Sequence, residues 1–153
     1  MWLNARRLLI PFSGMSKNFT LKELTFSATA ERDGIDNTPS PEVVGHINEL
    51  CDNLLQPLRD AWGKPIRVTS GYRCPELNKK VGGSMTSAHL CGYAADLQSG
   101  DFLEFTRFAV AWLQDKAYDQ CIIERNGKAE WLHLGYKDGQ GRQRHQTKTI
   151  NKN

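Results

Sequence analysis

The sequence lacks any hydrophobic run that approaches the roughly 18 residues needed to cross a bilayer. Cysteine is scarce: the four cysteines lie far apart and none forms a Cys-x-x-Cys pair, which argues against a disulfide scaffold and favours reduced thiols. Neither sign of charge dominates, because 20 basic and 17 acidic residues are spread along the chain. A nucleic-acid-binding function would be supported by the pI of about 8.7 alone, and it would predict that binding depends steeply on salt concentration. We therefore expect no nucleic-acid partner.

The beginning of the sequence is a poor match to an export signal. Arg6 and Arg7 precede a short apolar patch, but Pro11 interrupts it well before the 7–15 residues that such a signal needs. We therefore expect residues 1–14 to be an extension outside the fold. Residues 15–153 suffice for one compact core, and we expect a single domain with a basic polar tail from about residue 138.

Capping patterns and apolar periodicity predict the helices. Thr20-Leu-Lys-Glu23 has the pattern of a capping box, and Ser40-Pro41-Glu42 supplies an N-cap before apolar residues at helical spacing. A loop through Gly34 and Pro39 is expected between these two starts. The expected helices cover residues 21–25, 41 to about 63, 75–81 and 101–115.

Alternating and hairpin patterns predict the strands, at residues 66–70, 94–97, 120–124 and 130–136. Asn126-Gly127 suits the tight turn of a hairpin between the last two. Helices come first and strands follow with one inserted helix. This order indicates an α+β fold with a small, mostly antiparallel sheet and flanking helices.

Two separate segments carry residue types that bind metal ions. His89 and Asp96 bracket Gly92, where the chain can turn sharply, and Glu130-Trp-Leu-His133 adds a histidine and a carboxylate. Three nitrogen or oxygen ligands with a fourth position left to water are typical of catalytic zinc. Zinc lowers the pKa of its bound water to roughly 7, so that a spare carboxylate can take the proton. Glu130 is our candidate for that base.

These segments resemble the M15 family of zinc D-Ala-D-Ala peptidases and related phage endolysins, in the pattern Ser-x-His-x-x-Gly-x-Ala-x-Asp followed by Glu-x-x-His. The likeness extends through Thr69-Ser-Gly-Tyr-Arg-Cys-Pro-Glu-Leu-Asn78 and Val81-Gly-Gly-Ser84, and covers most of residues 15–137. It implies the fold shared with the Hedgehog signalling domain. It also implies one Zn²⁺ ion on His89, Asp96 and His133, with Glu130 as the catalytic base.

The resemblance implies roles for further residues. Arg73 is expected to be catalytic, because a guanidinium stays charged and offers paired donors to an oxyanion or to a substrate carboxylate. Ser87, Tyr72 and Trp131 are expected to bind substrate or to support the ligands.

Alternatives stay open for several of these residues. Cys91 could join His89 in a different metal site, although Asp96 and Glu130 would then have no role. Arg73 could instead form a structural ion pair with Glu76.

The remaining polar and aromatic residues have simpler explanations. Trp131 and Tyr136 could pack against the sheet or line a groove. We expect His46 and His145 to face solvent, and Glu124 to be a solvated charge at a strand end.

The hypothesis is a zinc metallopeptidase that cuts an amide bond in peptidoglycan stem peptides or cross-links, as a D,D-carboxypeptidase or an endopeptidase. The alternative is a non-catalytic, zinc-stabilised module that binds cell wall or a protein. We expect a monomer. Because we find no recognisable export signal, we also expect the protein to be made in the cytoplasm and to reach the wall by phage-type release.

Overall fold

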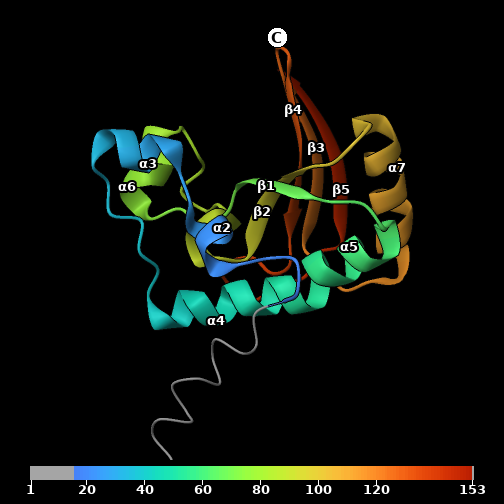
Figure 1. Cartoon of the computed structure of the whole chain (residues 1–153), viewed down its shortest axis with the longest axis horizontal. Helices are drawn as coiled ribbons and strands as arrows, with labels where there is room; N and C mark the ends of the chain where they lie inside the picture. The colour runs from blue at the N-terminus through green and yellow to red at the C-terminus, as the bar shows by residue number, and fades with distance from the viewer. Residues whose placement is uncertain (1–15, 153) are drawn as a thin grey trace, which may run out of the picture.

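The computed structural model describes residues 16–152, and the expected extension at residues 1–14 lies outside them. It is an α+β fold, as predicted (Figure 1). The helices are α2 (Leu21–Thr25), α3 (Ala28–Asp33), α4 (Pro41–Leu50), α5 (Gln56–Trp62), α6 (Pro75–Lys80) and α7 (Phe102–Trp112), with a π-helical segment η1 (Cys51–Leu55) and two 3₁₀ turns, η2 (Ala88–Cys91) and η3 (Leu113–Asp115). No helix in residues 16–152 is long and apolar enough to cross a membrane.

Five strands form one sheet in the order β1-β2-β4-β3-β5. They are β1 (Arg67–Ser70), β2 (Ala94–Gln98), β3 (Gln120–Asn126), β4 (Ala129–Gly135) and β5 (Gln146–Lys152). All neighbours pair antiparallel except β3 and β5, which are parallel. The prediction of a mostly antiparallel sheet is therefore confirmed.

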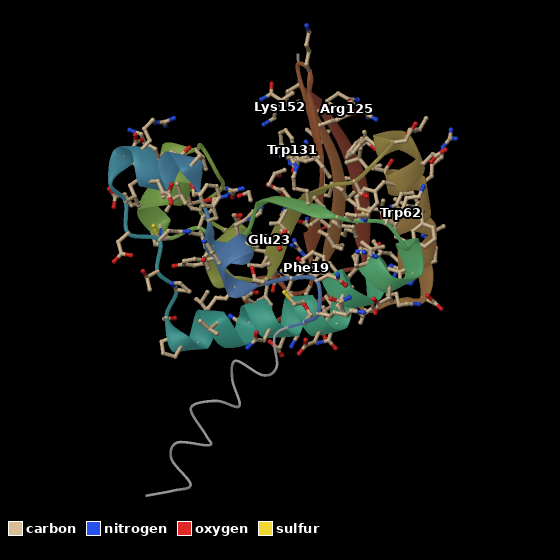
Figure 2. All side chains as sticks on the ribbon, in the orientation of Figure 1. Phe19, Glu23, Trp62, Arg125, Trp131 and Lys152 are labelled. Atoms are coloured by element: carbon tan, nitrogen blue, oxygen red, sulfur yellow. The ribbon has the colours of Figure 1, made fainter. Side chains whose placement is uncertain are left out.

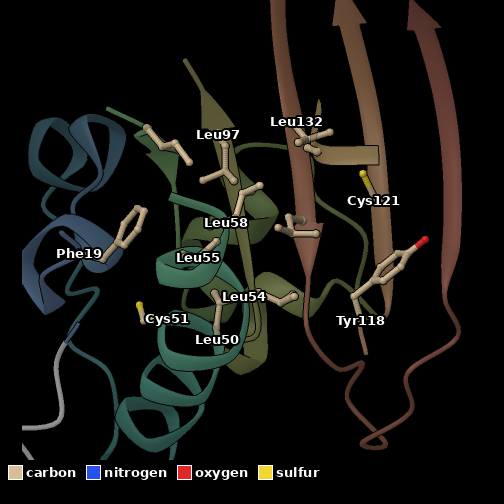
Figure 3. Packing of buried hydrophobic residues seen from close by; sticks show 14 of the residues in the cluster. Phe19, Leu50, Cys51, Leu54, Leu55, Leu58, Leu97, Tyr118, Cys121 and Leu132 are labelled. Atoms are coloured by element: carbon tan, nitrogen blue, oxygen red, sulfur yellow. The ribbon is translucent and has the colours of Figure 1, made fainter. Parts of the chain in front are cut away.

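One face of this sheet packs against the helix that was expected over residues 41–63. It runs through α4, η1 and α5 and ends at Gly63, whose φ of 77° is the left-handed conformation of a helix C-cap. Figure 3 shows Leu55 and Leu58 of this helix beside Leu97 of β2 and Leu132 of β4. Because strand side chains alternate, the residues that flank Leu97 and Leu132 along their strands point to the other face.

One α-helix and one strand were not predicted. Helix α3 lies within the expected loop: the Ser27 hydroxyl accepts a hydrogen bond from the amide of Ala30, and Gly34 closes the helix with a φ of 66°. Strand β5 lies within the expected polar tail. It follows Arg144, whose guanidinium donates hydrogen bonds of 2.8 and 2.9 Å to Asp119, a carboxylate with only 1% of its surface exposed.

Gly71, which follows β1, is a position where only glycine fits. A Cβ atom there would lie 2.2 Å from the backbone oxygen of Leu24, which accepts a hydrogen bond from the amide of Tyr72. The strand end and helix α2 are thus joined backbone to backbone.

We expect Gly71→Ala to lower the free energy of unfolding by about 1–3 kcal/mol, because the backbone itself must shift. Gly45→Ala is the matched control: Gly45 lies inside α4, a Cβ atom added to it would meet nothing within 4 Å, and alanine should stabilise the helix by about 0.5–1 kcal/mol. Urea denaturation of both variants measures the difference. Equal stabilities would contradict the close approach.

Candidate active site

Three buried polar side chains converge on the face of the sheet opposite the core. The Oδ1 atom of Asp96 lies 3.2 Å from Nε2 of His89 and 3.2 Å from Nδ1 of His133. The three potential ligand atoms all lie within 4.8 Å of one another. His89, Asp96 and His133 are 2%, 7% and 8% exposed, so the cluster is almost fully removed from solvent.

Local structure brings these side chains together. Asp96 on β2 and His133 on β4 are direct partners in the antiparallel register, which places their side chains side by side on one face. His89 comes from the turn η2, which begins at Ser87 and ends at Gly92 with a φ of 81°. A Cβ on Gly92 would approach Val43 within 2.9 Å, so this glycine allows both the turn and the close packing on α4.

The protonation of the cluster suits a metal ion. Nδ1 of His89 lies 2.7 Å from the carbonyl oxygen of Gly71, which can only accept, so Nδ1 carries the proton and Nε2 presents its lone pair to Asp96. Burial lowers the pKa of His89 and favours this neutral form, although Asp96 opposes the shift. Burial alone would raise the pKa of Asp96, but His89 and His133 outweigh it and hold that pKa well below its usual range.

The distances provide a test of the fit to zinc. Ligand atoms at about 2.0–2.1 Å from a tetrahedral zinc ion lie roughly 3.3 Å apart. The two distances of 3.2 Å from Asp96 Oδ1 match this value. A lone pair on His89 Nε2 facing a carboxylate oxygen is unfavourable unless a cation lies between them. The residues present therefore fit a bound zinc ion.

The cluster lies in a groove of about 720 Å³. One wall comes from the segment before α3, from the end of α6 and from the loop at residues 82–87, and includes Phe26 and Val81. The other comes from β3, β4 and β5, and includes Trp131 and Lys152. Figure 2 shows Trp131 and Lys152 near the far end of the β3–β4 hairpin, across from α3 and α6.

Comparison with known proteins agrees with this geometry. The family model described as Peptidase M15 matches residues 17–135, which is most of the chain. The chain belongs to the peptidase M15 family. A zinc D-Ala-D-Ala carboxypeptidase from Streptomyces albus G is 49% identical over 47 residues, which cover 30% of this chain and 18% of that protein. The match thus spans less than a fifth of the relative's length.

Arg73 of this M15 chain points toward the cluster. Its Nη2 atom lies 3.6 Å from Oδ2 of Asp96, and its Nε donates a 3.1 Å hydrogen bond to the hydroxyl of Ser70. Burial lowers its pKa, and the negative charges of Asp96 and Glu124 oppose this. Within residues 16–152, the ion-pair partner of Arg73 is Asp96 and not Glu76, so the structural pairing with Glu76 is not formed there.

Glu130, the candidate base, lies on β4 with its side chain directed away from the cluster. It precedes His133 by three positions in a regular strand, so the two side chains point to opposite faces. Glu130 forms a 3.4 Å ion pair with Arg125, the residue opposite it on β3, and borders a separate hollow on the α7 side that includes Phe102. Glu130 does not border the groove that holds the cluster, and its expected role as the catalytic base stays a prediction.

Glu124 is the carboxylate that the hairpin brings to the groove instead. It pairs with Trp131, while Ile122 pairs with His133, so Glu124 is a diagonal neighbour of His133 on the same face. It lines the same groove as the three ligands. Burial raises its pKa, Asp96 adds to this and His133 opposes it. It is partly buried, so its description as a solvated strand-end charge is wrong.

The remaining expected site residues all border the groove. Ser87 caps η2, since its hydroxyl accepts a 3.2 Å hydrogen bond from the amide of His89. Tyr72 is 8% exposed and belongs largely to the core. Trp131 lies in the groove wall and is half-buried, which favours a groove-lining role over simple packing.

Cys91, His46 and His145 lie outside the metal-ligand cluster. Among the described residues, His89 groups with Asp96 and His133 and not with Cys91. His46 does not face solvent: its ring stacks on Tyr93 at a centroid distance of 4.2 Å and its Nδ1 donates to the carbonyl of Cys91. His145 is exposed, as expected.

Proposed function

We propose that this chain is a zinc metallopeptidase that hydrolyses an amide bond in the stem peptides or cross-links of bacterial peptidoglycan. The observation that carries the proposal is the buried His89, Asp96 and His133 cluster on the floor of a groove that also presents Glu124 and Arg73. A structural zinc site usually has four protein ligands, whereas this cluster has three among the described residues and opens onto the groove.

Glu124 is the proposed general base. A bound zinc ion would polarise the substrate carbonyl and acidify a water molecule. Glu124 would take the proton from that water and pass it to the leaving amine, with both transfers made by the same carboxylate. Burial raises the pKa of Glu124, which makes its carboxylate a better proton acceptor, while the carboxylic acid that forms is still acidic enough to protonate a leaving amine.

Arg73 is the proposed electrophilic partner. Its guanidinium is held beside Asp96 at the side of the cluster and borders the groove. From there it can donate to the oxyanion that develops on the scissile carbonyl, or to a carboxylate of the substrate. The side chains of Trp131 and Phe26, on opposite groove walls, would exclude water from the bound peptide.

The substrate class is inferred from the relative and from the groove. The Streptomyces protein is named for action on D-Ala-D-Ala, the end of the peptidoglycan stem. The groove of about 720 Å³ falls within the range of ligand sites and has room for more than a dipeptide. Cleavage within a stem or cross-link is therefore as compatible with its size as removal of one terminal residue.

Digestion of defined muropeptides tests this function. The protein is incubated with linear and cross-linked muropeptides, with zinc and with chelator, and new termini are identified by mass spectrometry. We expect zinc-dependent release of a fragment, and loss of turbidity from cell-wall suspensions if the role is endolysin-like. Zinc binding without any product would support a non-catalytic binding module and contradict the proposal.

We expect Arg73→Ala to lower kcat/KM by roughly 10²–10³-fold, the usual effect of removing one oxyanion donor. Zinc content, measured by atomic absorption, should stay at the wild-type level. Arg107→Ala is the control, because Arg107 is an exposed arginine on α7. If the Arg73 and Arg107 variants retained the same activity, Arg73 would have no part in the reaction.

A further inference from the structure

Asn78 is a buried polar residue next to the active site without an assigned role. It lies on α6 and is 3% exposed. Its Oδ1 accepts a 3.0 Å hydrogen bond from Nη1 of Arg73, and its Nδ2 donates a 2.9 Å hydrogen bond to the carbonyl oxygen of Ser84. Arg73 can only donate and a carbonyl can only accept, so this amide has one orientation and both its ends are satisfied.

These contacts fix the plane of the Arg73 guanidinium. Nε is held by the hydroxyl of Ser70 and Nη1 by Asn78, so two sides of the group are occupied by the protein. The remaining nitrogen, Nη2, is the one that faces Asp96 at 3.6 Å. A planar group held at two edges cannot turn its third edge away without breaking both bonds.

The loop after α6 closes over this pair. A Cβ at Gly83 would lie 2.1 Å from Oδ1 of Asn78 and 2.7 Å from Nη1 of Arg73. The amide of Gly83 also donates a 2.8 Å hydrogen bond to the backbone oxygen of Asn78. The backbone at Gly83 therefore covers one side of the Arg73–Asn78 hydrogen bond and limits the access of water to it, which strengthens the bond.

We propose that Asn78 is a positioning residue for the reaction: its amide, covered by Gly83, holds the Arg73 guanidinium toward the metal ligands and ties it to the loop that forms one wall of the groove. This role rests on the proposed function of Arg73. Because Ser84 borders the groove and is bonded to the same amide, a displacement of the loop by substrate would be transmitted to Arg73.

A double-mutant cycle tests this role. Wild type, Asn78→Ala, Arg73→Ala and the double variant are compared in kcat/KM on one muropeptide, with zinc content and melting temperature measured for each. Asn78→Ala should lower kcat/KM by roughly 10–100-fold when Arg73 is present. In the Arg73→Ala background, the same change should cost less than about threefold, because there is no guanidinium left to position.

The control and the contrary outcomes are defined by the same cycle. Lys79→Ala, at an exposed position of α6, should leave kcat/KM unchanged. An equal loss in both backgrounds, or no loss at all, would overturn the positioning role. If Asn78→Ala does not fold, Gly83→Ala, which displaces the amide from the opposite side, replaces it in the cycle. An inactive wild type would instead refute the proposed function.

Discussion

Glu124→Gln is expected to lower kcat by about 10²–10⁴-fold while the protein stays folded and keeps its zinc. The amide has the size of the carboxylate but cannot accept the proton of a water molecule. Its position supports this expectation, because Glu124 shares a face of the hairpin with His133 and lines the groove. Rates on a defined muropeptide, together with zinc content, measure the effect.

Glu130→Gln is the matched control for this variant. Glu130 lies on the neighbouring strand of the same hairpin, but on the opposite face and in an ion pair with Arg125. We expect Glu130→Gln to change kcat by less than about threefold, because the side chain points away from the groove. The fold should also be preserved, since surface ion pairs contribute little to stability. The reverse result, with Glu130 required and Glu124 dispensable, would refute the assignment of the base.

The direction of the Glu130 side chain shows what a motif leaves undetermined. Glu-x-x-His places two residues close in sequence, and on a helix they would share a face. On a strand, two side chains three positions apart point to opposite faces of the sheet. In the observed hairpin Glu124 pairs with Trp131, two residues before His133, and therefore shares a face with His133. Side-chain alternation, applied to the predicted strands, would have added Glu124 as a second candidate for the base.

The long helix over residues 41–63 and the β3–β4 hairpin could be predicted because each has a local cause. Ser40 caps the helix, and Gly127 has the positive φ of 61° that the turn requires. Strand β5 has no such local cause. Its side chains are mostly exposed and show no apolar alternation, and it is anchored by distant partners such as Asp119, which accepts from Arg144, and Tyr118, which contacts Thr147.

Some residues of the candidate site could likewise be predicted from local patterns, and others could not. His89 and Asp96 could be found because a short segment with one glycine holds both, and His133 because it ends a recognisable pattern. The partner of Arg73 could not be found, because Asn78 reaches it only after α6 and the loop at Gly83 have folded back together. A buried hydrogen bond of this kind depends on tertiary packing and has no signature in residue spacing.

Removal of zinc should abolish activity and destabilise the fold together. The ligands come from η2, β2 and β4, so a bound ion would link segments that are distant in sequence. At a free zinc concentration of about 1,000 times Kd, the stabilisation would be about 4 kcal/mol. We expect chelation to lower the melting temperature and stop muropeptide cleavage, and added zinc to restore both.

Asp96→Asn and Cys91→Ser identify the ligands in this experiment. Asp96→Asn removes the charge to which both histidines are directed, and we expect it to lose zinc and, with it, the shift in melting temperature. Cys91→Ser should keep both, because Cys91 is not part of the cluster among residues 16–152. Zinc titrations followed by calorimetry measure the two affinities. If the serine variant lost zinc and the asparagine variant kept it, the metal site would be the His89 and Cys91 pair instead.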